Sequence, residues 1–202
     1  MKIYRIRRAT PGPLDWSTAA SLDDFVFPWQ AGAAPRTEFR ALHDEQQLYF
    51  RFDCVDHDVV LAEGESVRER VIGSDRVEIF VTPDLSLDPY YCLEMDPRAQ
   101  VLAYRCRLYR QFDWDWQCQG LAVEASIDGQ RYSVEGRLPL ATLRALDVLK
   151  PGARELYAGV YRGEFSHQPD GSVHFGWMPW VNPHTEKPDF HVPESFGRFV
   201  LD

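Results

Sequence analysis

The chain has 202 residues, 45% of them hydrophobic and 13% aromatic, which excludes general disorder and suits a single domain. Its formal net charge of −9 excludes a general nucleic-acid binder, because phosphate contacts require a basic surface, and it disfavours anionic membranes as a partner. A negative charge fits a neutral ligand, a cation or simple solubility. We therefore expect one soluble domain over residues 1–202.

The sequence has no targeting or membrane-spanning pattern. No run of about 18 apolar residues is present, and no apolar stretch follows the basic residues 1–8. These features predict a cytoplasmic protein without a signal peptide. The cysteines lack CxxC spacing, and three of the four lie in strand-like runs, which favours structural thiols over disulfides or a zinc site. They are Cys54, Cys92, Cys106 and Cys118.

Short alternating segments separated by turns dominate the first half of the chain. Residues 37–42 and 48–55 alternate across a polar turn, and the second segment places Leu48, Phe50 and Phe52 on one face. A period of two over this length predicts strands rather than a helix. Further strands are expected over residues 76–82, 90–95 and 101–108.

The second half of the chain predicts more strands, one helix and one long loop. Residues 121–127 and 130–138 flank Asp128-Gly129, which predicts a hairpin with a type I′ turn. Leucines at every third position after Pro139 predict a short helix over residues 139–149. We expect the remaining residues to form a strand, a long structured loop and a final strand. Their ranges are 157–165, 167–193 and 195–201. About ten strands with one short helix predict an all-β fold, an antiparallel β-sandwich of jelly-roll type.

Four segments carry a family resemblance when they are taken in order. They are Leu48 to Asp56, Asp75 to Phe80, Tyr90 to Asp96 and Phe190 to Gly197. Together with residues 134–140, this set resembles the family 9 carbohydrate-binding modules and their single-domain bacterial relatives. The resemblance extends from about Trp29 to Asp202. It implies a β-sandwich related to the ligand-binding domains of the dopamine-monooxygenase-N-terminal-like superfamily.

The resemblance also implies a non-catalytic sugar site. In sugar-binding members, two tryptophans clamp a reducing-end sugar, and polar side chains nearby contact its hydroxyls. Glu78 matches a sugar-contacting glutamate, whereas Glu94 and Asp96 occupy the places of an arginine and an asparagine. Ile72 stands where one tryptophan would be, and Phe190 replaces the other. These two differences bear on the sugar specificity that the resemblance implies, and they leave the implied fold intact.

Residue chemistry supports the same kind of site. Aromatic rings pack against the C–H face of a pyranose, and charged groups hydrogen-bond to its hydroxyls. The predicted ligand-binding residues are Glu78, Glu94, Asp96, Arg162, Trp177, Trp180, Phe190 and His191. Trp177 and Phe190 are the expected stacking rings. Under the alternative interpretation, the aromatics fill one end of the sandwich, and the acids lie on a solvated face paired with Arg76 or Arg105.

Several other functions stay open as alternatives. The same scaffold could serve protein interaction or oligomerisation, and no oligomeric state is assigned. A glycoside hydrolase would need two carboxyl groups flanking the scissile bond. Haem binding would use Met95 or Met178, but no CxxCH motif is present.

Metal binding is the last alternative. The histidines between residues 167 and 191 match no HExxH pattern. Asp53, Asp56 and Asp58 could bind a structural calcium ion, although they lack EF-hand spacing. We therefore expect no catalytic residue and no cofactor, with structural calcium as the one exception. The expected partner is a carbohydrate or a similarly polar small molecule, not a nucleic acid or a membrane.

Overall fold

The computed structural model describes all residues, 1–202, as a chain of strands with very little helix. The strands are β1 (Ile3–Arg8), β2 (Thr37–His43), β3 (Gln47–Val55), β4 (Arg76–Thr82), β5 (Tyr90–Met95), β6 (Val101–Arg107), β7 (Gln111–Asp113), β8 (Ala122–Ile127), β9 (Arg131–Pro139), β10 (Glu155–His167), β11 (Val173–Pro179) and β12 (Gly197–Leu201). The helices are α1 (Val67–Gly73) and α2 (Leu140–Ala145), with short 3₁₀ turns at Trp16–Thr18 and Pro193–Ser195. This content confirms the all-β prediction.

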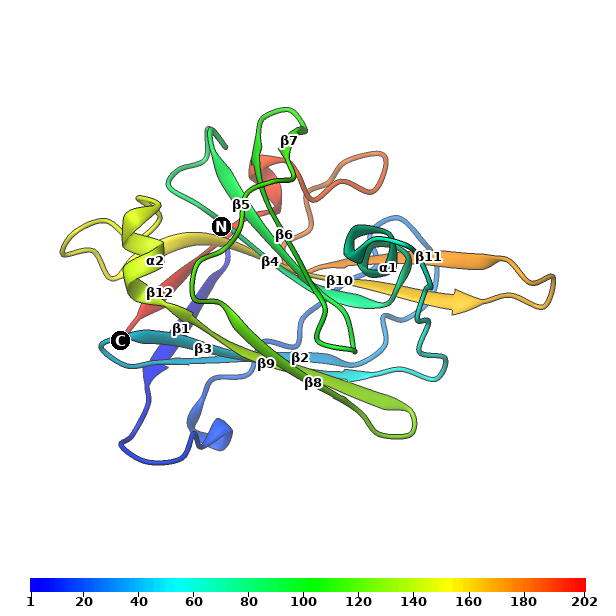
Figure 1. Ribbon diagram of the computed structural model, residues 1–202, viewed down its shortest axis with the longest axis horizontal. Coiled ribbons are helices and arrows are strands. Elements are labelled where there is room, and N and C mark those ends of the chain that lie inside the picture. Colours follow the sequence, from blue (N-terminus) through cyan, green and yellow to red (C-terminus); the bar gives the residue numbers. More distant parts are fainter.

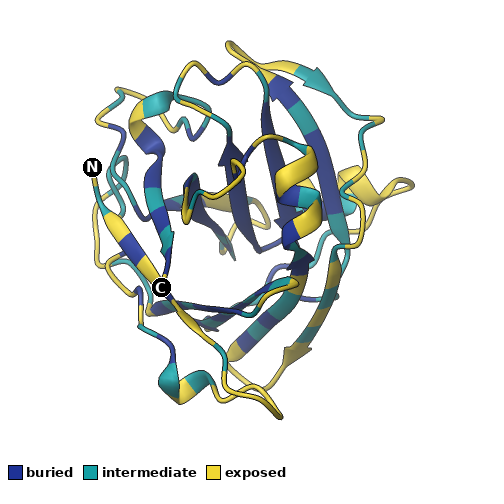
Figure 2. Cartoon of the chain, turned by 90° about the vertical axis from the view of Figure 1, so that its left-hand side faces the viewer, coloured by how far each residue is buried: buried dark blue, intermediate teal, exposed yellow.

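The strands form one curled sheet in the order β7-β6-β5-β4-β10-β12-β1-β2-β3-β9-β8, and β11 pairs with β10 (Figure 1). We call β4 to β7 with β10 to β12 the first half, and β2, β3, β8 and β9 the second half. The two halves lie one above the other in Figure 2. The strand β1 joins them, since Ile3 to Ile6 pair with β12 while Arg7 and Arg8 pair with β2.

Both pairings of β1 are parallel, which corrects the expectation of a wholly antiparallel sheet. The reason is topological: a single strand passes from one half to the other and finds neighbours on both sides that run in its own direction. The pairings between the remaining strands are antiparallel, as expected. The sheet is therefore mixed, and it curls so that its two halves face each other across the main core.

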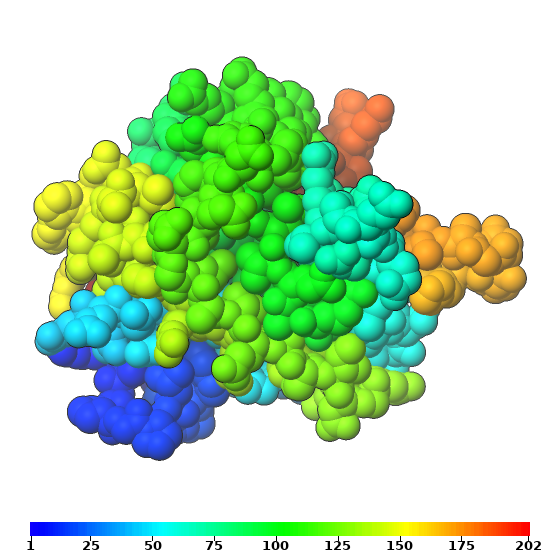
Figure 3. All heavy atoms as spheres, in the orientation of Figure 1, coloured from blue at the N-terminus to red at the C-terminus, as the bar shows by residue number.

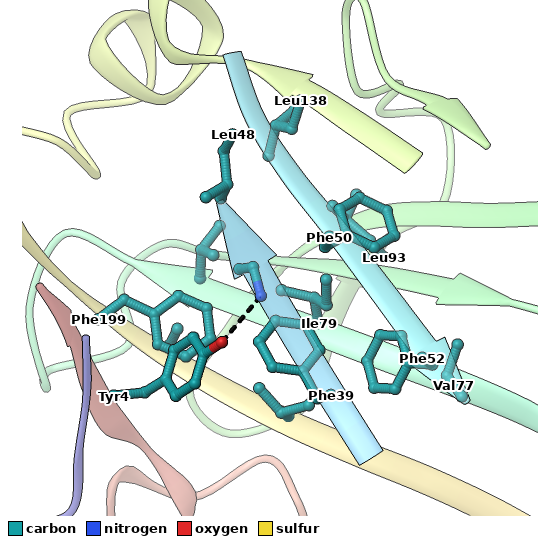
Figure 4. Packing of buried hydrophobic residues seen from close by; sticks show 14 of the residues in the cluster. Tyr4, Phe39, Leu48, Phe50, Phe52, Val77, Ile79, Leu93, Leu138 and Phe199 are labelled. Atoms are coloured by element: carbon teal, nitrogen blue, oxygen red, sulfur yellow. Dashed lines mark hydrogen bonds between the residues drawn. The ribbon is translucent and has the colours of Figure 1, made fainter. Parts of the chain in front are cut away.

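The main core lies between the two halves and contains 31 buried residues (Figure 4). Alternate residues of β3 point into it, among them Leu48, Phe50 and Phe52, as the sequence period predicted. Burial of each such side chain stabilises the fold by about 1.5–3 kcal/mol. The Tyr4 hydroxyl is buried at the edge of this core, where it accepts a hydrogen bond from the Ala41 N–H at 2.8 Å.

The first half is also covered on its outer face, which is unusual for a sheet that could face water. In β4, Val77 and Ile79 point into the main core, whereas Glu78 and Phe80 point outward, as the alternation of side chains along a strand requires. Phe80 belongs to an outer cluster of 11 buried residues. The cover comes from α1, from the β7 region and from the segment of residues 181–196. This outer cluster positions the candidate site.

The turn between β8 and β9 differs in type from the prediction. Asp128 and Arg131 exchange backbone hydrogen bonds, so the two loop residues are Gly129 and Gln130. Gly129 has a φ of 57°, whereas Gln130 has no positive φ. This pattern belongs to a type II′ turn, which needs glycine only at its first central position.

The structure also differs from the sequence prediction in both of its α-helices. The helix α2 ends at Ala145, earlier than predicted, because Asp147 has a φ of 58°, the left-handed conformation that stops a helix. The helix α1 was not predicted, although the sequence carries a signal for it. Its signal is the capping box, in which the Ser66 side chain accepts from the Glu69 N–H and the Glu69 carboxylate accepts from the Ser66 N–H.

The prediction of one long structured loop over residues 167–193 is wrong for the first part of this range. Residues 173–179 form β11, which pairs with Tyr161 to His167 of β10. The resulting hairpin is drawn in orange and extends beyond the body of the molecule (Figures 1 and 3). Histidine, glycine and proline in this segment hide its strand character, because its pairing depends on the partner strand more than on intrinsic propensity.

Candidate functional site

A pocket of about 270 Å³ lies on the outer face of the first half. The strands β4 and β5 supply its floor, β11 supplies one wall, and residues 188–191 with the loop after β6 supply the rest. The residues that line it are Arg76, Glu78, Glu94, Arg110, Trp177, Pro188, Asp189, Phe190 and His191. Five of the eight predicted site residues therefore lie together.

Two carboxylates and one guanidinium form the floor. Glu78 and Glu94 are directly opposite each other on β4 and β5, and both approach Arg76. The Arg76 Nε is 2.9 Å from Glu78 Oε1 and 2.7 Å from Glu94 Oε2. The side chains of Arg76, Glu78 and Glu94 are only 5%, 2% and 7% exposed. We call these three residues the buried triad.

The two carboxylates of the triad accept hydrogen bonds from different donors. The Arg76 Nε–H donates to Glu78, and Nη1 donates to the Ile72 carbonyl oxygen at 2.9 Å. The Tyr104 hydroxyl donates to Glu94 Oε1 at 2.7 Å. Glu94 Oε2 is buried and receives no hydrogen bond, although it lies close to the Arg76 cation. The floor therefore retains an unused acceptor.

Burial controls the protonation of this site. Burial and the neighbouring Glu94 raise the pKa of Glu78 to about 8, against the opposing effect of Arg76. At neutral pH the pair of carboxyl groups therefore holds a proton. Burial and the nearby Arg110 cation lower the pKa of His191 to about 3, so its imidazole is neutral. The His191 Nδ1 lies 2.8 Å from the Tyr90 hydroxyl oxygen.

One aromatic wall of the pocket is more open than the other. Trp177 is half-buried, and the Arg76 guanidinium lies 5.1 Å from the centre of its ring. Phe190 is buried and stacks on Tyr161 with a centroid separation of 4.2 Å. The two predicted stacking rings meet at 81°, with centroids 5.9 Å apart. Trp177 therefore offers the larger accessible ring surface.

An ion pair closes the opposite rim of the pocket. The Arg110 Nη2 donates to Asp189 Oδ1 at 2.9 Å, and the Tyr109 hydroxyl donates to Asp189 Oδ2 at 2.7 Å. Although burial raises the pKa of Asp189, these donors and the His191 N–H lower it below its ordinary value. Asp189 is thus an anion whose charge Arg110 compensates.

The structure places three predicted site residues outside the pocket. Asp96 is buried in the turn after β5, where it accepts from the backbone N–H groups of Arg98 and Gln100. Trp180 is buried in the main core with its ring 6.1 Å from that of Phe199. The turn and the core fully occupy these side chains, which corrects their assignment as ligand contacts.

Arg162 is the third corrected residue, and it is buried between the two halves. Its Nη1 donates to Thr37 Oγ1 at 2.9 Å and to the Val55 carbonyl oxygen at 3.0 Å. Its Nη2 donates to Asp56 Oδ2 at 2.8 Å. Neighbours on a strand point to opposite faces, so Tyr161 faces the outer cluster while Arg162 points inward. Its role is therefore structural.

Sequence reasoning did not assign four of the pocket residues to the site, namely Arg76, Arg110, Pro188 and Asp189. Arg76 had been considered only as a surface ion-pair partner, although its spacing from Glu78 places both on one strand face. Arg110 and Asp189 lie 79 positions apart and meet only in the folded chain. Trp114 is another aromatic residue near the site, but it does not line the pocket. Its ring packs on that of Tyr104 with a centroid separation of 4.7 Å, and the Arg68 guanidinium covers it at 3.7 Å from its centre.

The residues of the metal and haem alternatives have other partners. The structure contains no group of three or more His, Cys, Asp or Glu side chains that could hold a metal ion. The three aspartates considered for calcium contact Arg51, Arg162 and His167 respectively. Met95 and Met178 are packed in the main core. None of the helices has the length and apolar character needed to cross a membrane.

The structure is an all-β domain with a pocket on the outer face of its first half. The sequence profile of the family described as carbohydrate family 9 binding domain-like matches residues 14–202, so the chain belongs to this family. The family resemblance expected from the sequence is thereby confirmed. No protein of curated function matches the chain.

Solved structures show the same fold. A protein from Bacteroides uniformis ATCC 8492, provisionally described as carbohydrate-binding, has a TM-score of 0.79 at 18% identity and covers 100% of this chain and 99% of its own. A family 9 carbohydrate-binding module from Caldicellulosiruptor kristjanssonii, solved with glucose, has a TM-score of 0.61 at 17% identity, with 100% and 96% covered. Its family 9 counterpart with cellotriose has a TM-score of 0.59 at 17% identity, with 99% and 93% covered.

Proposed function

We propose that the pocket binds a carbohydrate without cleaving it. The observation that carries the proposal is the partly exposed ring of Trp177, which lines the pocket beside the buried triad. A pyranose can lay its C–H face on such a ring while charged groups hydrogen-bond to its hydroxyls. The glucose and cellotriose complexes of the Caldicellulosiruptor kristjanssonii module support this choice of ligand class.

The arrangement of the carboxyl groups favours binding over hydrolysis. A glycosidase positions its two carboxyl groups on either side of the scissile bond. Glu78 and Glu94 instead lie side by side on neighbouring strands and share one arginine. The proposal requires no metal or cofactor. We also propose that the curled sheet is a fold of jelly-roll type and that the protein is cytoplasmic.

Calorimetric titration with glucose and with cellotriose tests the proposal. We expect saturable binding to the wild type, with affinity lowered about tenfold or more, or about 1.4 kcal/mol, in Trp177→Ala. The matched control is Trp16→Ala, because Trp16 is also half-buried but contacts Glu135 of the second half. A reducing-sugar assay with cellotriose should detect no cleavage.

Three results would count against this function. Absence of heat with either sugar and with a wider sugar panel, from protein that is folded by circular dichroism, would favour the protein-interaction alternative. Equal losses in Trp177→Ala and Trp16→Ala would remove the pocket as the binding site. Release of new reducing ends would make the domain a hydrolase.

A further inference from the structure

The buried triad carries an unbalanced charge. When both carboxyl groups are ionised, Arg76 compensates only one of them, because the same Nε approaches both Glu78 and Glu94. All three side chains are more than nine-tenths buried. An uncompensated buried charge is costly, and a buried carboxyl group removes it most simply by taking up a proton.

No neighbouring group supplies a second free positive charge. The other ionisable groups packed around the triad are Cys92, Tyr104, Arg110, Tyr161, Asp189 and His191. Burial raises the pKa of the cysteine and of both tyrosines, so these groups stay neutral. The imidazole of His191 is neutral, and Asp189 already compensates Arg110. The missing charge must therefore come from a proton or from a ligand.

Hydrogen bonding indicates which carboxyl group takes the proton. Glu94 already accepts a hydrogen bond from the Tyr104 hydroxyl through Oε1. Glu78 receives only the Arg76 Nε–H, through Oε1. Its Oε2 makes no hydrogen bond within the protein, so a proton there could be donated to a ligand in the pocket.

We propose that sugar binding in this pocket is linked to a proton on Glu78, which acts as a hydrogen-bond donor to a ligand hydroxyl oxygen. The inference rests on the proposed function and adds the protonation state in which the site works. A bound sugar displaces water from above the triad and so makes the ionised form of Glu78 still less favourable. Affinity is then constant near neutrality and falls by up to about tenfold per pH unit once the free protein loses the proton.

Calorimetry with glucose as the probe tests this linkage. Titrations at about pH 7 and about pH 9, each in two buffers of different ionisation enthalpy, give the number of protons taken up on binding. We expect almost none at the lower pH and up to one at the higher pH, with weaker binding there. Uptake of no proton at the higher pH, with unchanged affinity, would overturn the proposal.

Two variants, Glu78→Gln and Glu94→Gln, locate the proton, and Glu124→Gln is the control. Glu78→Gln keeps the size and the neutral charge of the protonated acid, so its glucose affinity should not change between the two pH values. Glu124→Gln removes one acidic group from the exposed face of β8 and should behave as the wild type. In Glu94→Gln, one acid faces one arginine, so the fall in affinity should disappear or move to lower pH. A fall that persists unchanged in Glu78→Gln would place the proton elsewhere.

A titration without ligand separates this inference from the proposed function. Between about pH 7 and about pH 9.5, potentiometry of the folded wild type should release up to one more proton than Glu78→Gln. If this difference is present but no sugar binds, the proposed function fails and the linkage fails with it, while the buried proton stands. If sugar binds and the difference is absent, the inference alone is wrong.

Discussion

Replacement of Arg162 by methionine tests the structure most directly, because sequence and fold assign this residue different roles. Arg162 makes three hydrogen bonds in the interior, one of them to Asp56, whose side chain is 1% exposed. Arg162→Met fills a similar volume but leaves a buried carboxylate unpaired, which costs about 3–5 kcal/mol. For a domain of this size, the melting temperature should fall by about 6–20 °C.

Urea and thermal unfolding at neutral pH measure this loss, and a double variant controls for it. Arg162→Met with Asp56→Asn removes both charges, so it should be more stable than the single variant. Glucose affinity, measured where the single variant is folded, should stay near the wild-type value because Arg162 lies outside the pocket. A loss of less than about 1 kcal/mol together with abolished sugar binding would refute this reasoning, and Arg162 would then be a ligand contact.

Two further predictions concern the stability of the fold, one at Trp180 and Trp177 and one at Glu78. Trp180→Ala should lower the free energy of unfolding by about 3–5 kcal/mol, whereas Trp177→Ala should cost less, which urea midpoints will compare. Equal losses would contradict the half-buried position of Trp177. The pKa of Glu78 is raised from 4.5 to about 8 in the folded state, so the folded chain holds this proton more tightly than the unfolded chain. Stability should therefore fall as the pH rises between these values, and fall less in Glu78→Gln, as unfolding at about pH 5 and about pH 8 will test. The same slope in both proteins would contradict this reasoning.

The strand pattern was predictable wherever one strand face meets the core and the other meets water. The strand β3 alternates between buried and partly exposed residues, so its period of two identified both its type and its inner face. The opposite faces of Glu78 and Ile79 on β4 were readable in the same way. The capping box formed by Ser66 and Glu69 is likewise a local signal, and it marks the start of α1.

The inner faces of doubly covered strands were not predictable. In β10, seven of the eight residues from Leu156 to Gly163 are buried, so polarity along the strand does not distinguish the core face from the outer face. For this reason the sequence predicted Arg162 as a polar site residue, whereas the structure places it in the interior. Contacts such as the one between Arg110 and Asp189 depend on the approach of distant segments, which no local pattern encodes.

The two buried arginines show what distinguishes a site from a structural pair. Each has carboxylates as neighbours: Arg76 contacts Glu78 and Glu94, and Arg162 contacts Asp56 with Asp75 nearby. Arg162 lies between the two halves, where its side chain is fully buried and its terminal nitrogens donate to three protein acceptors.

The Arg76 group lies instead against a half-buried tryptophan, Trp177, and its surplus carboxyl group borders the pocket. The composition of the two groups is nearly the same, so charge type alone cannot assign a function to either. Access to a ligand separates them, and that access depends on β11, a strand that the sequence did not predict, and on residues 188–191.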